Sequence, residues 1–322
     1  MREAAFIKKN KDKWQQFEDI LSKKITVSPD KLSDLYIEIT DDLSFAKTFY
    51  PTSKVVAYLN GISATAHLKI YVTKKESKNR FISFFKTEFP LAFYQHQKQL
   101  LITFSVFLFF AIVGAFSAAN DVDFVRVILG DSYVNMTLEN IEKGDPMAVY
   151  KKQAEMDMFL GITINNIRVA MMAFIFGILF SIGTLFIMMQ NGIMLGSFLY
   201  FFYDKDLLWE SSRTIWIHGT IEISVIIIAG CAGMVLGNGI LFPKTYSRLE
   251  SFKKSIKEGL KIMVSTIPFF IIAGFLEGFV TRHTEMPDWL AVFIILSSLN
   301  LIVYYYIIYP IKLTKKMQKN VQ

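Results

Sequence analysis

Long, nearly uncharged stretches dominate the chain after residue 99. The first, Leu100 to Ala119, is 20 residues long, which is the length that a helix needs to cross a hydrocarbon core of about 30 Å. Later stretches of similar character run from Thr214 to Pro243, from Ile262 to Thr281 and from Trp289 to Ile311. Each of the four predicts a membrane-spanning helix.

A fifth stretch, Val169 to Tyr203, contains no charged residue over 35 positions. A straight helix of that length would extend about 50 Å, which is too long for one span. The polar triplet Gln190, Asn191 and Gly192 contains an Asn-Gly pair, which favours a turn. The sequence therefore predicts a hinge at this triplet, with a full span before it. The short third segment after it either crosses or re-enters the membrane.

The distribution of charge orients these spans, because Lys and Arg are retained on the cytoplasmic side. Residues 1–98 hold 17 basic against 11 acidic residues, and the linker 244–261 holds six against two. The loop 120–166 reverses the balance with four basic and eight acidic residues, whereas the tail 312–322 has basic residues and no acidic one. Six crossings place all four regions on their preferred sides. We therefore expect a multi-pass protein of the bacterial inner (plasma) membrane with both termini cytoplasmic.

The first 98 residues predict helices rather than a further span. Apolar residues recur at helical spacing after Pro29, and Tyr50-Pro51 separates this helix from the next one. Aromatic residues gather beside basic ones between Phe81 and Tyr94. This pattern is typical either of a segment in the inner membrane interface or of one that covers a helical bundle. The predicted organisation is a cytoplasmic region (1–98), a transmembrane domain (99–311) and a basic cytoplasmic tail (312–322).

Composition supports this all-α, polytopic membrane class. The 322 residues are 52% hydrophobic and 20% charged, with 30 Phe, whereas an ordinary soluble domain carries about 25% charged residues. The single cysteine, Cys231, excludes an intramolecular disulfide and a cysteine-based zinc site. The net charge of +7 is distributed over separate loops. Nucleic acid is therefore not an expected partner, whereas membrane lipids are.

Four ionisable residues lie inside the predicted spans or at their ends, where charge is costly and usually has a partner or a function. His218 and Glu222 are four residues apart, so they share one face of a helix. Glu277 lies in the next span, and Arg168 begins the second span at a comparable depth. We expect these residues to form an intramembrane polar cluster. Its role is either structural or that of a site for an ion, a proton or a polar head group.

No catalytic motif accompanies this cluster. The segment His218-Gly-Thr-Ile-Glu222 has Glu where a HExxH zinc protease has its second His, and no further His lies in the predicted spans. The sequence contains no G-x-S-x-G elbow and no Gly-rich phosphate loop. It therefore predicts no enzyme activity, no cofactor and no metal site.

Small residues recur every four positions in the fourth predicted span, at Ala229, Gly233 and Gly237. This spacing lets the backbone of another helix approach closely. The second predicted span repeats the pattern between Ala173 and Ser181. The two spans are candidates to pack against each other, and either one is a candidate to pack against a second copy in a homo-oligomer.

Several of these motifs occur together in one family. They are the His-Gly-x-x-Glu motif at 218–222, the glycine-rich run that ends at Gly237, the Pro-Lys-Thr-Tyr-Ser-Arg segment at 243–248, and Glu277. In this combination the chain resembles the stage II sporulation protein M family of membrane proteins. Further similarity between Asp42 and Gly61 extends the resemblance into the N-terminal region, and thus over nearly the whole chain.

The resemblance implies a polytopic inner-membrane protein without an established enzyme activity. It favours a non-enzymatic scaffold or anchor for cell-envelope partner proteins, including proteins that act on peptidoglycan. The alternative is a transporter or channel-like protein for an ion, a proton or a lipid, using the intramembrane His/Glu cluster. The long N-terminal region is a departure from the family's namesake.

Overall fold

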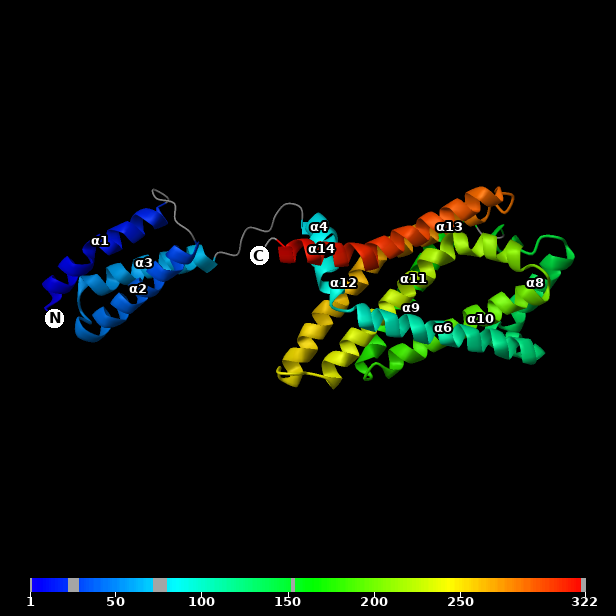
Figure 1. Ribbon diagram of the computed structural model, residues 1–322, viewed down its shortest axis with the longest axis horizontal. Helices are drawn as coiled ribbons and strands as arrows, with labels where there is room; N and C mark the ends of the chain where they lie inside the picture. The colour runs from blue at the N-terminus through cyan, green and yellow to red at the C-terminus, as the bar shows by residue number, and fades with distance from the viewer. Residues whose placement is uncertain (1, 23–28, 72–79, 152–153, 320–322) are drawn as a thin grey trace. The chain divides into compact units, whose positions relative to one another are not determined.

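The computed structural model describes residues 2–22, 29–71, 80–151 and 154–319. The chain forms two compact units, Met1–Arg80 and Phe81–Gln322, and the described ranges contain helices and no strand (Figure 1). The all-α class is thereby confirmed. The predicted boundary at residue 98 concerns the side of the membrane and stays a prediction, as does the tail, whose residues 320–322 lie outside the described ranges.

The first unit is a three-helix assembly. Its helices are α1 (Glu3–Leu21), α2 (Pro29–Phe49) and α3 (Lys54–Tyr71). It has a hydrophobic core of its own that includes the fully buried Phe17, Ile39 and Leu59. The buried indole of Trp14 donates a hydrogen bond of 2.7 Å to Asp42, and Lys13 forms an ion pair of 2.7 Å with the same carboxylate. A core of this kind predicts that the unit folds independently.

The second unit contains six helices that are long and apolar enough to cross a membrane, as the sequence predicts. They cover Gln97–Asn120, Glu155–Ile178, Ile182–Asp204, Leu208–Leu241, Arg248–Thr281 and Asp288–Lys319. In the labels of Figure 1 these are α6 (Gln97–Asn120), α9 (Glu155–Ile175) with η3 (Phe176–Ile178), α10 (Ile182–Asp204), α11 (Leu208–Leu241), α12 (Arg248–Phe275) with η4 (Leu276–Thr281), and α13 (Asp288–Val303) with η5 (Tyr304–Ile308) and α14 (Tyr309–Lys319).

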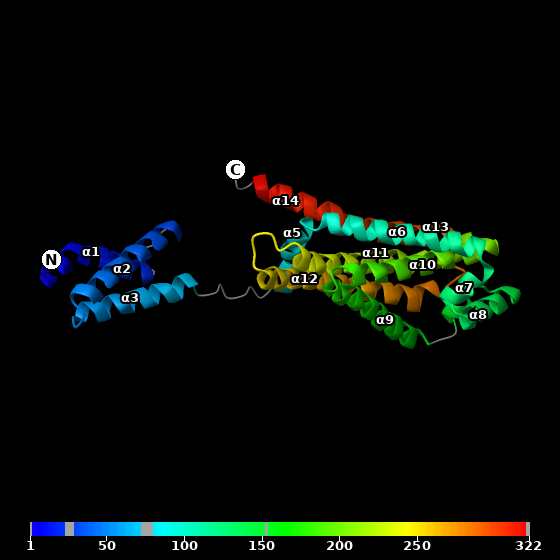
Figure 2. The same cartoon turned by 90° about the horizontal axis from the view of Figure 1, so that it is seen from below.

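Shorter helices lie outside these six. They are α4 (Arg80–Ser83), η1 (Phe84–Glu88), α5 (Phe89–Tyr94), α7 (Val122–Leu129), α8 (Asp131–Glu142) and η2 (Ala148–Lys151). The helices α7 and α8 lie at one end of the bundle, which we call the α7/α8 end, and the α9–α10 and α11–α12 turns lie at the other, the hairpin end (Figures 1 and 2). The charge pattern predicts that the α7/α8 end is outside.

Helix α11 is the centre of the bundle. In its most apolar 18-residue stretch, 72% is buried inside the protein, compared with 17% in that of α6 and 22% in that of the last span. Most apolar side chains of α6 and α13 therefore face outward, where a membrane would cover them. The fully buried Val225, Ala229 and Cys231 of α11 belong to the main hydrophobic core.

The predicted hinge at Gln190, Asn191 and Gly192 is wrong, because these residues lie inside the continuous helix α10. The third span is also full length rather than short. The chain instead turns just before α10, where Phe180 and Ser181 have φ of 53° and 67°. Left-handed backbone at two residues with side chains is costly, and packing of the buried Ser181 beside α11 offsets that cost.

Gly192 has a different role from the predicted one. A Cβ atom added at Gly192 would lie 2.5 Å from the carbonyl oxygen of Phe107 on α6. The glycines Gly114 and Gly196 face the opposite helix in the same way. The Asn-Gly pair therefore marks a close contact between α6 and α10, and glycine serves there because it has no side chain.

The predicted small-residue pattern lies at a second close contact, between the α9–η3 segment and α11. A Cβ atom added at Gly233 would collide with the carbonyl oxygen of Ala173, and one added at Gly177 would collide with the backbone of Gly233. Gly237 faces the backbone of Ser181, and Ala229 is fully buried one turn before Gly233. The small residues are thus used in packing within one chain.

The aromatic segment before α6 packs against the bundle. Phe89 and Phe93 are fully buried, and each ring contacts Tyr306 with centroids 5.6 and 5.5 Å apart. The hydroxyl of Tyr305 donates a hydrogen bond of 3.0 Å to the carbonyl oxygen of Phe85. The segment thus covers part of the bundle, whereas a position in the membrane interface stays a prediction, since Phe81 and Ile82 are 72% and 49% exposed.

Candidate functional site

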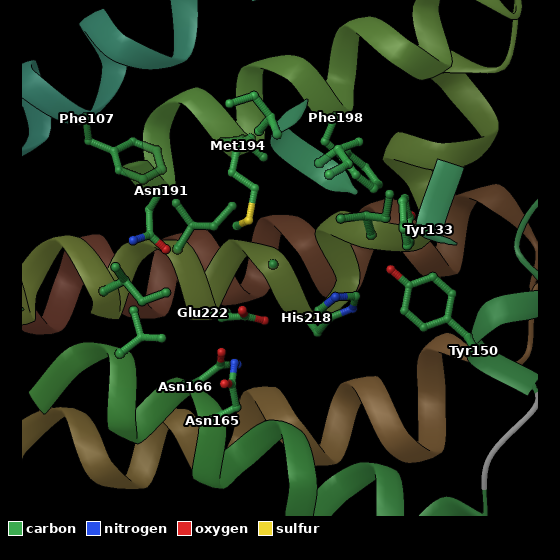
Figure 3. Close-up of a pocket in the computed structure, with 18 residues that line it drawn as sticks. Phe107, Tyr133, Tyr150, Asn165, Asn166, Asn191, Met194, Phe198, His218 and Glu222 are labelled. Carbon is green, nitrogen blue, oxygen red and sulfur yellow. The ribbon is translucent and has the colours of Figure 1, made fainter. Parts of the chain in front are cut away.

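A cavity of about 480 Å³ lies in the half of the membrane unit nearest the α7/α8 end. Its walls come from α6, α9, α10 and α11, and residues of α7, α8 and η2 complete the lining. Figure 3 shows Glu222 and His218 at the centre of the view, with Asn165 and Asn166 below them and Tyr150 beside His218. The polar residues that line it are Tyr133, Tyr150, Asn165, Asn166, Asn191, His218 and Glu222.

His218 stands in the buried face of the central helix α11. Its side chain is 5% exposed. Its Nδ1 lies 2.9 Å from the hydroxyl oxygen of Thr281, and its Nε2 lies 3.7 Å from a carboxylate oxygen of Glu277. When Nδ1 carries the proton and donates it to Thr281, Nε2 presents a lone pair towards Glu277.

Glu222 follows one helical turn after His218, on the same face. Figure 3 shows the side chain of Asn166 on α9 facing the carboxylate of Glu222. The ligand atoms of His218, Glu222 and Glu277 all lie within 4.8 Å of one another. The structure therefore brings together three of the four residues in the predicted cluster.

Glu277 and Thr281 both lie beside His218, in the last segment of the fifth span. Both belong to η4, which is a π-helical segment. Residues four apart lie on nearly the same side of such a helix, as they do in an α-helix, and π-helical turns are frequent at functional sites. Thr281 is 1% exposed, so its contact with His218 is fully inside the protein.

Arg168, the fourth predicted member, does not belong to the cluster. It is exposed and does not line the cavity. Two further arginines near this end have other partners: Arg213 pairs with Asp288, and Arg282 pairs with Glu155 at 2.9 Å. Among the described residues, neither Glu222 nor Glu277 has an ion pair with Lys or Arg. Burying unpaired carboxylates is expensive, so each charge has to be balanced by a proton or a bound cation.

Two tyrosines that line the cavity, Tyr133 and Tyr150, were not found from the sequence, because no motif surrounds them. The ring of Tyr150 meets His218 edge to face, with centroids 5.7 Å apart. Burial raises the pKa of Tyr150 well above its ordinary value, and it raises the pKa of Tyr133 to about 12. Both phenols therefore stay protonated at neutral pH and can donate a hydrogen bond into the cavity.

The predicted hinge residue Asn191 is also part of this cavity. Its amide nitrogen donates a hydrogen bond of 2.8 Å to the carbonyl oxygen of Ile187, one turn earlier in α10. This leaves the amide oxygen on the cavity side, as Figure 3 shows. Asn191 therefore does not form a turn, and its polar side chain lines the cavity instead.

A second His/Glu pair lies toward the hairpin end. His96 Nε2 is 3.0 Å from a carboxylate oxygen of Glu258, within a cavity of about 430 Å³. Lys254 also lines this cavity and stands over the ring of Tyr246 at 5.1 Å. Here one carboxylate meets one imidazole with lysine nearby, so the pair resembles the first site in composition but lacks its second carboxylate.

The fold and the site define a multi-pass membrane protein, a helical bundle with a buried His/carboxylate cluster at an internal cavity. The family model of stage II sporulation protein M matches residues 103–282. This is more than half of the chain, so the protein belongs to the stage II sporulation protein M family. The matched range contains His218, Glu222, Glu277 and the packing glycines.

The N-terminal region is similar to a different family. Residues 4–72 match the model of a domain of unknown function (DUF8413). The expectation that the resemblance covers nearly the whole chain is therefore corrected: the family match covers the membrane unit, and the first unit is a distinct module. The physical reason is the separate hydrophobic core of that unit.

One relative is an uncharacterized protein of Methanocaldococcus jannaschii. It is 26% identical over 156 residues, which cover 48% of this chain and 68% of the relative. No solved structure matches the chain.

Proposed function

We propose that this protein is a non-enzymatic membrane scaffold that anchors cell-envelope partner proteins, including ones that act on peptidoglycan. The observation that carries the proposal is the close packing of helices between the cavity and the hairpin end. The backbones of α11 and the α9–η3 segment meet at Gly233, Ala173 and Gly177. The cavity ends before this contact, at Val169 and Ile226, on the side of the α7/α8 end. A pocket that ends between tightly packed helices suits binding and anchoring better than passage across the membrane.

Two surfaces are available for partners. The first unit has its own core and is therefore a separate module that can bind a cytoplasmic protein. At the α7/α8 end, charged side chains of α8 and its turn stand out from the bundle: Asp131, Lys143 and Glu139 are 77%, 72% and 68% exposed. On the predicted outer side, such groups would meet envelope proteins.

The test is recovery of partners from native membranes after cross-linking of the full chain. The double substitution Glu139→Lys with Lys143→Glu keeps a 3.7 Å pair but reverses its direction. The matched control is the reversal of the exposed Asp204–Lys205 pair at the same end. We expect envelope proteins to copurify with the wild type and the control, and to be reduced in the α8 variant. Recovery of no envelope protein with the wild type would overturn the proposal.

A second candidate is transport of an ion or a proton, which the His/Glu cluster beside the cavity favours. It predicts ion or proton flux in proteoliposomes that Glu222→Gln abolishes, because an amide does not titrate near neutral pH. The scaffold proposal predicts no flux above protein-free vesicles. Flux that depends on Glu222 would therefore decide for transport.

A further inference from the structure

We propose that His218, Glu222 and Glu277 bind one divalent first-row metal ion, such as Zn²⁺, in the half of the membrane unit nearest the α7/α8 end. The site is independent of the scaffold proposal, because it rests on the geometry of three side chains and not on any partner. It is also a site that sequence spacing does not indicate, since two of the ligands are carboxylates on different helices.

The geometry fits a single ion after a small contraction. Two ligand atoms that bind one ion at about 2.0–2.1 Å lie about 3.4 Å apart at the tetrahedral angle. Nε2 of His218 and the carboxylate oxygen of Glu277 are already 3.7 Å apart. The three ligand atoms lie within 4.8 Å of one another, and rotation of a long Glu side chain can close the remaining distance.

The surroundings of His218 are those of a metal ligand. A ligating imidazole commonly donates its other ring N–H to a neighbouring oxygen, which fixes the tautomer and the orientation of the ring. Thr281 offers that oxygen 2.9 Å from Nδ1. The distance of 3.7 Å from Nε2 to Glu277 is too long for a hydrogen bond. A side chain that is 95% buried thus directs a nitrogen without a hydrogen bond at the carboxylate of Glu277, and Glu222 lies close by.

Charge balance points the same way. When both carboxylates are ionised, they carry two negative charges without a Lys or Arg partner, and one divalent ion neutralises both. The nitrogen ligand argues against Mg²⁺ and Ca²⁺, because these ions prefer oxygen ligands, whereas a mixture of imidazole and carboxylate suits zinc and its neighbours. Since His218 and Glu222 line the cavity, a fourth ligand, such as water, would come from the cavity side.

The experiment uses the full chain, purified without a polyhistidine tag and freed of metal with a chelator. It is then incubated with Zn²⁺ or Co²⁺ and desalted, and the metal content is measured by mass spectrometry. We expect one equivalent per chain in the wild type and in Glu258→Gln, which removes the carboxylate of the other His/Glu pair. We expect at least about tenfold weaker binding in Glu277→Gln and in Thr281→Val, the second through the loss of the oxygen that orients His218.

The Co²⁺ spectrum of the wild type keeps the test decisive if a variant does not fold. Binding by three protein ligands gives visible absorption bands unlike those of the hydrated ion. Overturning results are a wild type that shows only the hydrated spectrum, or one that retains less than one equivalent. Equal retention in the wild type and a folded Glu277→Gln would also overturn the proposal, because the metal would then be bound elsewhere.

Discussion

Nδ1 of His218 and the hydroxyl oxygen of Thr281 lie 2.9 Å apart, although 63 positions separate the two residues in the chain. Both side chains are buried, so Thr281→Val would leave a ring nitrogen without a partner. We expect Thr281→Val to lower the free energy of unfolding by about 1–3 kcal/mol. Thr281→Ser keeps the hydroxyl and should cost less. Thermal unfolding of the purified protein measures both, and an unchanged midpoint for Thr281→Val would contradict the contact.

Gly233 tests the close packing of α11. A methyl group there would collide with the backbone of Ala173, so Gly233→Ala should destabilise the protein by about 1–3 kcal/mol. Gly219 is the matched control on the same helix, because its added Cβ would meet Ile215 at 3.6 Å and Ile223 at 3.9 Å, which are ordinary contacts. Gly219→Ala should be neutral or stabilising by up to about 1 kcal/mol, as helix propensity favours alanine. Equal unfolding midpoints for the two variants would refute this account.

The orientation of the spans is a prediction from charge that cysteine labelling can test. The native Cys231 is fully buried and should not react. We expect Lys316→Cys in the tail to resist a membrane-impermeant maleimide until the membrane is opened, and Lys143→Cys beyond α8 to react at once. Both residues are exposed, so access to the reagent depends on the side of the membrane. Labelling of Lys316→Cys from outside would reverse the assignment.

The first unit should fold when residues 1–80 are produced alone, because its core is complete within the unit. We expect a helical circular dichroism spectrum and one cooperative thermal transition. Asp42→Ala should lower the midpoint, since it removes the acceptor of the Trp14 indole and the partner of Lys13. The loss is about 1–3 kcal/mol for a buried donor left unpaired. Glu38→Ala is the control, because Glu38 is 53% exposed and its contact with Lys13 is longer, at 3.5 Å. A non-cooperative fragment would contradict independent folding.

The positions of the spans follow directly from the sequence, because twenty apolar residues in a helix match the thickness of a membrane whatever their neighbours are. The shared face of His218 and Glu222 also follows, since their spacing belongs to the helix itself. The turn before α10 does not, because Phe180 and Ser181 are both unfavourable in a left-handed conformation, and the turn is held by packing of the buried Ser181 on α11. The sequence instead favours a turn at the Asn-Gly pair, but the glycine of this pair lies at the close contact between α6 and α10.

The composition of the site was decided by tertiary structure. Arg168 follows Asn166 by two residues, and two steps of about 100° place the two side chains on opposite sides of α9. Asn166 therefore faces Glu222, and Arg168 is exposed. Glu277 reaches His218 through the packing of α12 and η4 on α11. Residue spacing along one helix fixes which side chains share a face, but only the packing of several helices fixes which of those faces meet.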